Sequence, residues 1–280
     1  MGLAEIARPL TDAGHAGLAA LLAAPRDAVI ALDFDGTLAP IVPDPGRARA
    51  HPAAAPALRA LAPRVGTVAV VTGRPAELAV EYGGLAGLAG VVVLGHYGAE
   101  RWEAGRLTAP PPHPGVAAAR AELPGVLAAL GAPDGTWVED KGRSVAVHTR
   151  RTAEPVAAFE LLRGPVDALA AGHGLVVEPG RLVLELRPPG VDKGAALTAL
   201  LRERNARSVL YAGDDLGDVP AFAAVEKLRG EGLAGLLVAS AAVGDAPVRE
   251  LADRADLVVP GPAGVAELLA ALGEELSRPR

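Results

Sequence analysis

Polar side chains that could do chemistry follow apolar runs of this sequence at three places. At a fourth place, such a side chain stands at the start of a helical stretch. Ligands of open α/β sheets lie at the carboxyl ends of the strands, so these groups should converge on one edge of a sheet. Acidic, basic and hydroxyl groups in one place suit a phosphate ester together with a divalent cation. The four places are Asp33 with Asp35, Thr72 with Gly73, Lys193, and the trio Asp214, Asp215 and Asp218.

The two neighbouring carboxylates, Asp33 and Asp35, can carry different roles because they need not share one protonation state. We predict that Asp33 stays ionised and attacks phosphorus as a covalent nucleophile. Asp35 would donate a proton to the departing oxygen and later activate the hydrolytic water. The first carboxylate faces the phosphoryl group and the second faces the leaving alcohol.

The remaining groups suit the binding of a phosphate and a metal ion. The carboxylates of Asp33 and Asp214 are hard oxygen donors of the kind that Mg²⁺ prefers. Lys193 would neutralise phosphoryl oxygens, and Thr72 with the backbone amide of Gly73 would donate hydrogen bonds to them. Taken singly, each motif is explained equally well as a turn or a helix cap. All four in order favour the functional interpretation.

Apolar runs alternate with helical stretches along most of the chain, which indicates a parallel sheet covered on both faces. We predict an α/β fold, a Rossmann-like parallel-sheet hydrolase core with an inserted open-faced α/β cap domain. The predicted strands are 28–34, 67–73, 90–95, 208–215, 235–240 and 255–260, and the predicted helices include 52–61, 193–204 and 261–275.

The middle of the chain has another pattern, in which apolar and polar residues alternate along the strands. Alternation means that one face of a sheet is buried and the other is open. Two helical stretches, 116–130 and 155–171, accompany these strands. We therefore predict a discontinuous catalytic core over 1–104 and 188–280, and a cap domain over 105–187 that recognises the substrate.

Composition excludes several classes of protein. The chain of 280 residues has no cysteine, which rules out disulfides and thiolate chemistry. Its net charge of -6 comes without a block of like charges, so we expect neither a nucleic-acid partner nor an anionic membrane surface. The N-terminal stretch lacks a basic leader and reads as a short helix. We expect a cytoplasmic protein and a monomer.

Four motifs resemble those of the haloacid dehalogenase superfamily: D-F-D-G-T-L, T-G-R, an isolated K-G at a helix start, and G-D-D-x-x-D. The resemblance extends to trehalose-6-phosphate phosphatases from about residue 30 to 218, through D-P-x-x-A after the first motif and E-x-K-x-x-S in the middle region. It implies that Mg²⁺ is held by the Asp33 carboxylate, the Asp35 carbonyl and Asp214. Asp218 or Asp215 would act on the metal through water.

The same resemblance makes three residues of the middle region ligands of the distal sugar: Glu139, Lys141 and Glu185. The alternation agrees, because Leu184 and Leu186 share one face of a strand while Glu185 and Arg187 lie on the other. Ser144 likewise lies opposite Val145, and we predict that Ser144 and Arg187 also bind the substrate. Without the resemblance, these residues would be taken for a solvated sheet face.

One position departs from the family pattern, which reads G-x-H-G-A-E at this point. The chain reads GHYGAE, with Tyr97 in place of the histidine and His96 one residue earlier, so no role is carried over to His96.

The resemblance predicts hydrolysis of trehalose 6-phosphate through an aspartyl-phosphate. The alternatives are a phosphatase for another sugar phosphate, such as sucrose phosphate or a glycosyl phosphoglycerate, a phosphomutase, and a non-catalytic sugar-phosphate sensor.

Overall fold

The chain forms two compact units in a computed structural model that describes residues 2–180, 182–241 and 248–278. The first unit is Met1–Ala109 with Asp192–Arg280, and the second is Pro110–Val191. The strand Arg106–Thr108 belongs to the first unit, whereas the sequence placed residues 105–187 in the inserted domain. Each unit is described by itself.

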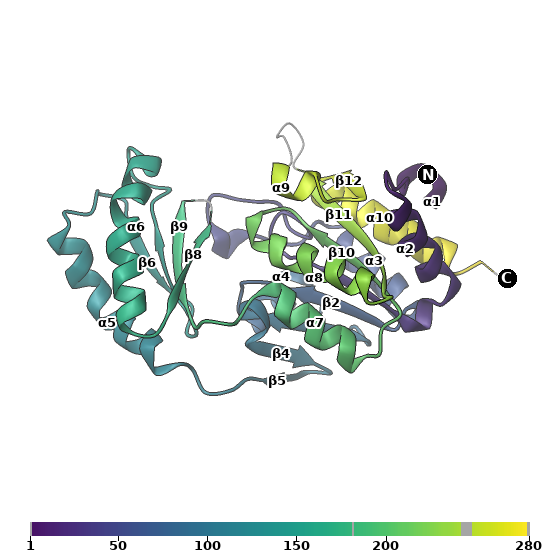
Figure 1. The fold of residues 1–280 in the computed structure, drawn as a ribbon, viewed down its shortest axis with the longest axis horizontal. Coiled ribbons are helices and arrows are strands. Elements are labelled where there is room, and N and C mark those ends of the chain that lie inside the picture. The colour runs from purple at the N-terminus through teal and green to yellow at the C-terminus, as the bar shows by residue number, and fades with distance from the viewer. Residues whose placement is uncertain (1, 181, 242–247, 279–280) are drawn as a thin grey trace. The chain divides into compact units, whose positions relative to one another are not determined.

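The first unit is built on an eight-stranded sheet with the order β12-β11-β10-β1-β2-β3-β4-β5 (Figure 1). Its strands from β12 to β3 are parallel, and β4 and β5 pair antiparallel at the edge. This confirms the predicted fold class. The strands are β1 Ala28–Leu32, β2 Thr67–Val71, β3 Val91–Gly95, β4 Glu100–Glu103, β5 Arg106–Thr108, β10 Ser208–Gly213, β11 Ala234–Ala241 and β12 Leu257–Pro260.

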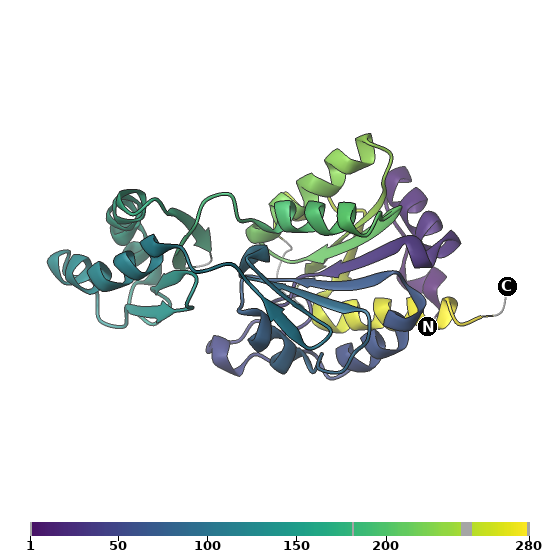
Figure 2. The same cartoon turned by 90° about the horizontal axis from the view of Figure 1, so that it is seen from below.

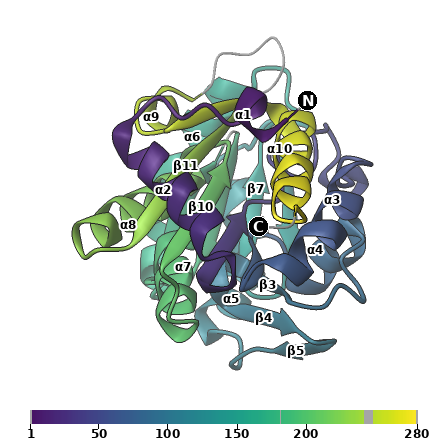
Figure 3. The same cartoon turned by 90° about the vertical axis from the view of Figure 1, so that its right-hand side faces the viewer.

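Helices cover both faces of this sheet, as Figures 2 and 3 show. The side chains of Ile30 and Leu32 pack into the core on one face, and those of Val29 and Ala31 pack into the core on the other. This is why the central strands are apolar throughout. The first face carries α1 Leu3–Ile6, α2 Asp12–Ala23, α3 Ala54–Leu61, α4 Ala76–Gly83 and α10 Gly261–Glu275, and the second carries α7 Lys193–Glu203, α8 Val219–Gly230 and α9 Arg249–Ala252.

The second unit has a four-stranded antiparallel sheet in the order β6-β7-β9-β8. Two helices pack on one face over an apolar core that includes Val145, Val147, Leu184 and Leu186. The opposite face carries the polar side chains of the same strands. The elements are α5 Pro114–Ala129, β6 Trp137–Asp140, β7 Val145–His148, α6 Pro155–Gly172, β8 Val176–Gly180 and β9 Val183–Arg187.

In the part of the chain that the structure describes, no helix has both the length and the apolar character needed to cross a membrane.

Candidate active site

Three adjacent parallel strands bring the predicted polar groups to one edge of the sheet. Strand β1 pairs with β10 on one side and with β2 on the other. Asp33 follows the last residue of β1, Asp214 follows β10, and Thr72 follows β2. The Asp33 amide also extends the ladder by donating to the Ala212 carbonyl at 2.9 Å. The three side chains therefore start from neighbouring strand ends.

Lys193 joins this group from the first turn of α7. Asp192 caps that helix through a 2.8 Å hydrogen bond from the Ala195 amide to its Oδ1. The Lys193 ammonium lies 2.7 Å from Asp33 Oδ1 and 2.8 Å from Asp218 Oδ1. All three side chains are at most 5% exposed. One cation is thus buried against two carboxylates.

Asp218 is the most heavily bonded of the carboxylates. Its Oδ1 accepts hydrogen bonds from Lys193 and from the Tyr211 hydroxyl at 2.6 Å. Its Oδ2 accepts from the amides of Asp214 at 2.9 Å and Asp215 at 3.2 Å. With both oxygens engaged, the carboxylate orients the lysine and the loop that carries Asp214.

The residues present fit a divalent metal ion. Carboxylate oxygens of Asp33, Asp214 and Asp218 all lie within 4.8 Å of one another. Asp214 Oδ1 is buried, and among the described residues it has no hydrogen-bond partner. Burial, and then the negative charge of Asp33, raises the pKa of Asp214 to about 10. A cation at this place would stabilise the ionised carboxylates and satisfy the buried oxygen.

Burial and neighbouring charges also shift the pKa values of Asp33 and Lys193. Burial raises the pKa of Asp33 well above its ordinary value, and Lys193 opposes that rise. Burial by itself would lower the pKa of Lys193, but Asp218 and Asp33 outweigh it and raise that pKa. The lysine therefore stays protonated beside the predicted nucleophile, as a phosphate-binding group must.

The turn after Asp35 brings the backbone against the metal cluster. Gly36 has φ +77°, and a Cβ built on it would lie 1.9 Å from Asp214 Oδ2. Its carbonyl accepts a 2.7 Å hydrogen bond from the Ser240 hydroxyl of β11. The position therefore needs glycine both for its left-handed backbone and for space. The hydroxyl of Thr37 is buried beside this turn and has no partner among the described residues.

The predicted phosphate loop after β2 contacts two other segments. The Thr72 hydroxyl accepts a 3.1 Å hydrogen bond from the Arg74 amide, and the Arg74 guanidinium contacts Asp35 through two atoms at 2.6 Å each. A Cβ on Gly73 would lie 2.7 Å from the Tyr97 hydroxyl. Tyr97 therefore lies against the backbone that was predicted to bind phosphate.

The segment that departs from the family pattern is strained. His96 and Tyr97 have φ values of +47° and +57°, which non-glycine residues seldom adopt. Their amides donate to the carbonyls of Arg74 and Thr72, both at 2.9 Å. Glu100 accepts a 2.9 Å hydrogen bond from the Ala76 amide at the start of α4. The strained pair thus ties the end of β3 to the loop after β2.

Three of the predicted sugar-binding residues meet on the polar face of the second unit. Glu185 accepts hydrogen bonds from Lys141 Nζ at 2.7 Å and from the Ser144 hydroxyl at 2.5 Å. Glu185 is 4% and Ser144 2% exposed, so the alternative of a solvated sheet face does not describe them. A buried carboxylate held by a lysine and a hydroxyl is an organised polar group.

The other two predicted residues have separate partners. Glu139 Oε2 lies 2.8 Å from His148 Nε2, and that imidazole stacks on Trp137 with a centroid separation of 4.3 Å. Arg187 contacts Glu178 at 2.5 Å. The strand register puts Glu139, Ala146, Glu185 and Glu178 in one row across the sheet. Ala146, which is fully buried, is the one residue in that row without a carboxylate.

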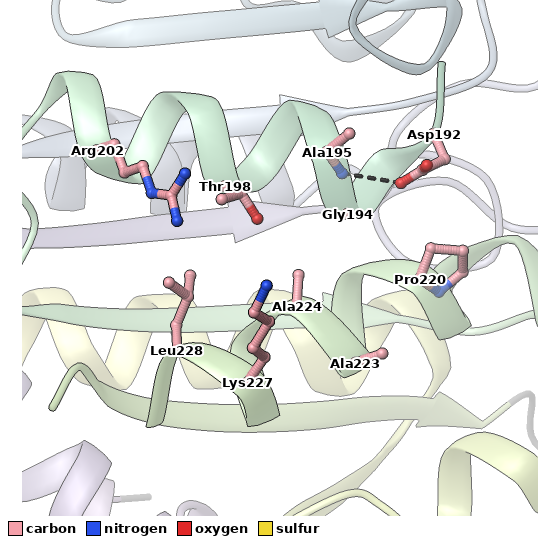
Figure 4. Close-up of a pocket in the computed structure, with 10 residues that line it drawn as sticks. All are labelled: Asp192, Gly194, Ala195, Thr198, Arg202, Pro220, Ala223, Ala224, Lys227 and Leu228. Carbon is pink, nitrogen blue, oxygen red and sulfur yellow. Dashed lines mark hydrogen bonds between the residues drawn. The ribbon is translucent and has the colours of Figure 1, made fainter. Parts of the chain in front are cut away.

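A groove of about 290 Å³ lies between α7 and α8 of the first unit (Figure 4). Its walls are formed by Thr198, Ala224 and Leu228, with the ends of Arg202 and Lys227 pointing into it (Figure 4). None of the residues that line it is a predicted catalytic or metal-binding residue. The groove is separate from the carboxylate cluster.

Sequence reasoning missed several residues of the site. Tyr211 looked like an ordinary strand residue, yet its buried hydroxyl bonds Asp218. Arg74 stands in the T-G-R motif without an assigned role, and Ser240 supports the turn at Gly36 from a strand far along the chain. A tyrosine in a strand buried on both faces is a signal that could have been used, because such a hydroxyl needs a partner.

The fold is that of the haloacid dehalogenase-like hydrolases. A hydrolase of this class from Bacteroides thetaiotaomicron superposes with a TM-score of 0.57 at 19% identity, covering 86% of this chain and 98% of that one. The trehalose-6-phosphate phosphatase C-terminal domain of C. albicans superposes with a TM-score of 0.75 at 20% identity, over 96% of this chain and 99% of that one.

A family model described as Trehalose-phosphatase matches residues 31–256, and the chain belongs to this family. A trehalose-phosphate phosphatase of Mycobacterium marinum is 36% identical over 270 residues, which are 91% of this chain and 64% of that protein. A protein of Mycobacterium tuberculosis named as an uncharacterized glycosyl hydrolase is 38% identical over 225 residues. That match covers 75% of this chain but 16% of the relative, so the chain corresponds to one part of that longer protein.

Proposed function

We propose that this protein is a phosphatase that hydrolyses trehalose 6-phosphate to trehalose and phosphate. The observation that carries the proposal is Lys193, buried between Asp33 and Asp218 where the parallel strands end, in a chain of the trehalose-phosphatase family. A sensor that only bound the ester would need no nucleophile beside a buried ammonium. The intact set of groups therefore favours catalysis.

The reaction proceeds in two steps on this chain's own side chains. Asp33 Oδ attacks phosphorus, the bond from phosphorus to the sugar oxygen breaks, and Asp35 delivers its proton to that oxygen. Water then attacks the aspartyl-phosphate while Asp35 takes up a proton. Phosphate leaves, and Asp33 is restored as a carboxylate. Lys193, Thr72 and the Gly73 amide hold the phosphoryl oxygens throughout.

A Mg²⁺ ion would be held by the carboxylates of Asp33 and Asp214 and the Asp35 carbonyl, with Asp218 or Asp215 acting through water. When bound, it supplies positive charge that stabilises the phosphoryl oxygens. Of these two, Asp218 lies in the carboxylate cluster with Asp33 and Asp214, which favours it for the water-mediated contact.

The polar face of the second unit would recognise the sugar. Glu185, organised by Lys141 and Ser144, presents a carboxylate that can accept hydrogen bonds from hydroxyl groups. Glu139 and Arg187 lie on the same face, on strands either side of β7. These five residues form the proposed sugar site. Monomeric state and a cytoplasmic location stay predictions from the sequence.

The fold alone does not separate an enzyme from a sensor. The C-terminal domain of a Candida albicans protein titled a trehalose synthase regulatory protein superposes with a TM-score of 0.62 at 14% identity, covering 88% of this chain and 93% of that one. A measurement of products decides. Incubating the protein with a panel of sugar phosphates, with Mg²⁺ or with a chelator, should release phosphate from trehalose 6-phosphate in the presence of the metal.

Two variants test the roles of the carboxylates. Asp33→Asn should reduce turnover to background, whereas Asp253→Asn, on an exposed helix end, should leave it unchanged. Asp35→Asn should lower the rate by roughly 10²–10⁴, with a smaller loss on aryl phosphates, whose leaving groups need little protonation. An isomerised sugar phosphate instead of free phosphate would refute hydrolysis, and unreacted substrate would support a sensor.

A further inference from the structure

Arg74 makes a two-point contact with Asp35 for which the proposed mechanism gives no reason. Its Nε lies 2.6 Å from Asp35 Oδ2, and its Nη2 lies 2.6 Å from Asp35 Oδ1. A planar guanidinium that meets both oxygens of a carboxylate fixes the direction in which the carboxylate points. Asp35 is about one-third exposed, at 35%, so packing by itself leaves its side chain room to turn.

Arg74 is itself held in place. Its side chain is 13% exposed, and its guanidinium carbon lies 5.5 Å from the centroid of the Phe34 ring and 5.6 Å from that of Tyr82. Its amide donates to the Thr72 hydroxyl at 3.1 Å, and its carbonyl accepts from the His96 amide at 2.9 Å. The arginine is therefore a fixed support beside a carboxylate that could otherwise move.

We propose that Arg74 is a positioning residue for Asp35, which holds this carboxyl group in the orientation where it exchanges its proton with the leaving oxygen and with water. The two guanidinium contacts, one to each oxygen, fix the plane of this carboxyl group beside the loop after β2. The inference rests on the proposed acid/base function of Asp35.

The decisive substitution is Arg74→Lys, which keeps the positive charge but cannot make the planar two-point contact. It should lower kcat for trehalose 6-phosphate by roughly tenfold, with little change in KM. A loss of this size is what the removal of one interaction between neighbouring side chains produces. The loss should shrink on aryl phosphates in parallel with that of Asp35→Asn, because both variants affect the same proton transfer. Arg74→Met, which also removes the charge, should likewise lose more activity on trehalose 6-phosphate than on aryl phosphates.

The double variant Arg74→Lys/Asp35→Asn makes the test specific. If Arg74 acts through Asp35, adding Arg74→Lys to Asp35→Asn should cost less than about twofold, because the group to be positioned is already gone. Arg101→Lys is the matched control. Arg101 also contacts carboxylates through several nitrogens, on Glu103 and Glu203, but these residues lie on β4 and at the end of α7. This variant should keep full activity on every substrate.

The outcomes separate this inference from the proposed function. Equal losses of Arg74→Lys on sugar and aryl phosphates, or full additivity with Asp35→Asn, would overturn the positioning role and leave the phosphatase proposal standing. A rise in KM without a change in kcat would instead assign Arg74 to substrate binding and also overturn it. Full activity of the single variant Asp35→Asn would refute the acid/base function itself, and with it the inference.

Discussion

The buried hydroxyl of Tyr211 offers a direct test of how the site is held together. It donates a 2.6 Å hydrogen bond to Asp218 Oδ1, and both residues are fully buried. Tyr211→Phe removes this donor and keeps the ring, which packs edge-on against Phe222 with centroids 5.9 Å apart. Because the shape of the side chain is retained, the change isolates the hydrogen bond.

The magnitude follows from the charge of the acceptor. A hydrogen bond to a charged group contributes about 1.5–3 kcal/mol. Its loss leaves Lys193 Nζ, at 2.8 Å, as the remaining donor to Asp218 Oδ1 among the described residues. For a unit of roughly 200 residues, this corresponds to a fall in Tm of about 3–12 °C. Thermal unfolding followed by circular dichroism measures this shift, and urea unfolding checks it through the midpoint.

Ser208→Ala is the matched control on the same strand. The Ser208 hydroxyl is buried, but it has no hydrogen-bond partner among the described residues. Removing an unsatisfied hydroxyl should leave the Tm unchanged or raise it slightly. A Tyr211→Phe variant as stable as the wild type, or a Ser208→Ala variant destabilised to the same extent, would refute the reasoning that Asp218 is stabilised by this donor.

Three further tests concern the turn, the metal and the sugar. Gly36→Ala and Gly87→Ala each place a side chain on a residue with φ +77°, but the new Cβ meets Asp214 at position 36 and open space at position 87. Turnover should therefore fall on the order of 10² in Gly36→Ala and be retained in Gly87→Ala. Retained activity of Gly36→Ala would contradict this. Mg²⁺ at 100 times its Kd should stabilise the protein by about 2.7 kcal/mol in thermal unfolding, and Asp214→Asn should abolish most of that shift; an equal shift in both proteins would place the ion elsewhere. Lys141→Ala and Glu185→Ala should each lower kcat/KM for trehalose 6-phosphate by roughly tenfold and leave p-nitrophenyl phosphate nearly unchanged, since that ester has no sugar to bind. A parallel loss on both esters would make these residues structural.

The sequence by itself determined the larger sheet and its functional edge. Apolar runs such as 28–34 and 208–215 are continuous because both faces of a parallel sheet are buried, and each ends in the polar residues that occupy the carboxyl edge. The structure places Asp33, Asp214 and Lys193 together there, as that rule requires. The hairpin of β4 and β5 was not predicted, because strands of four and three residues carry too short a pattern.

The partners of the polar groups were decided by the tertiary structure. The contact of Arg74 with Asp35, the donation of Tyr211 to Asp218 and the support of Gly36 by Ser240 depend on which strands are neighbours and on where each side chain points. No local pattern encodes these choices, because they arise when separate elements pack at fixed register. The same holds for Glu185, which a strand pattern would place on an open polar face. Lys141 and Ser144, from the turn between β6 and β7, contact its carboxylate, and the residue is 4% exposed.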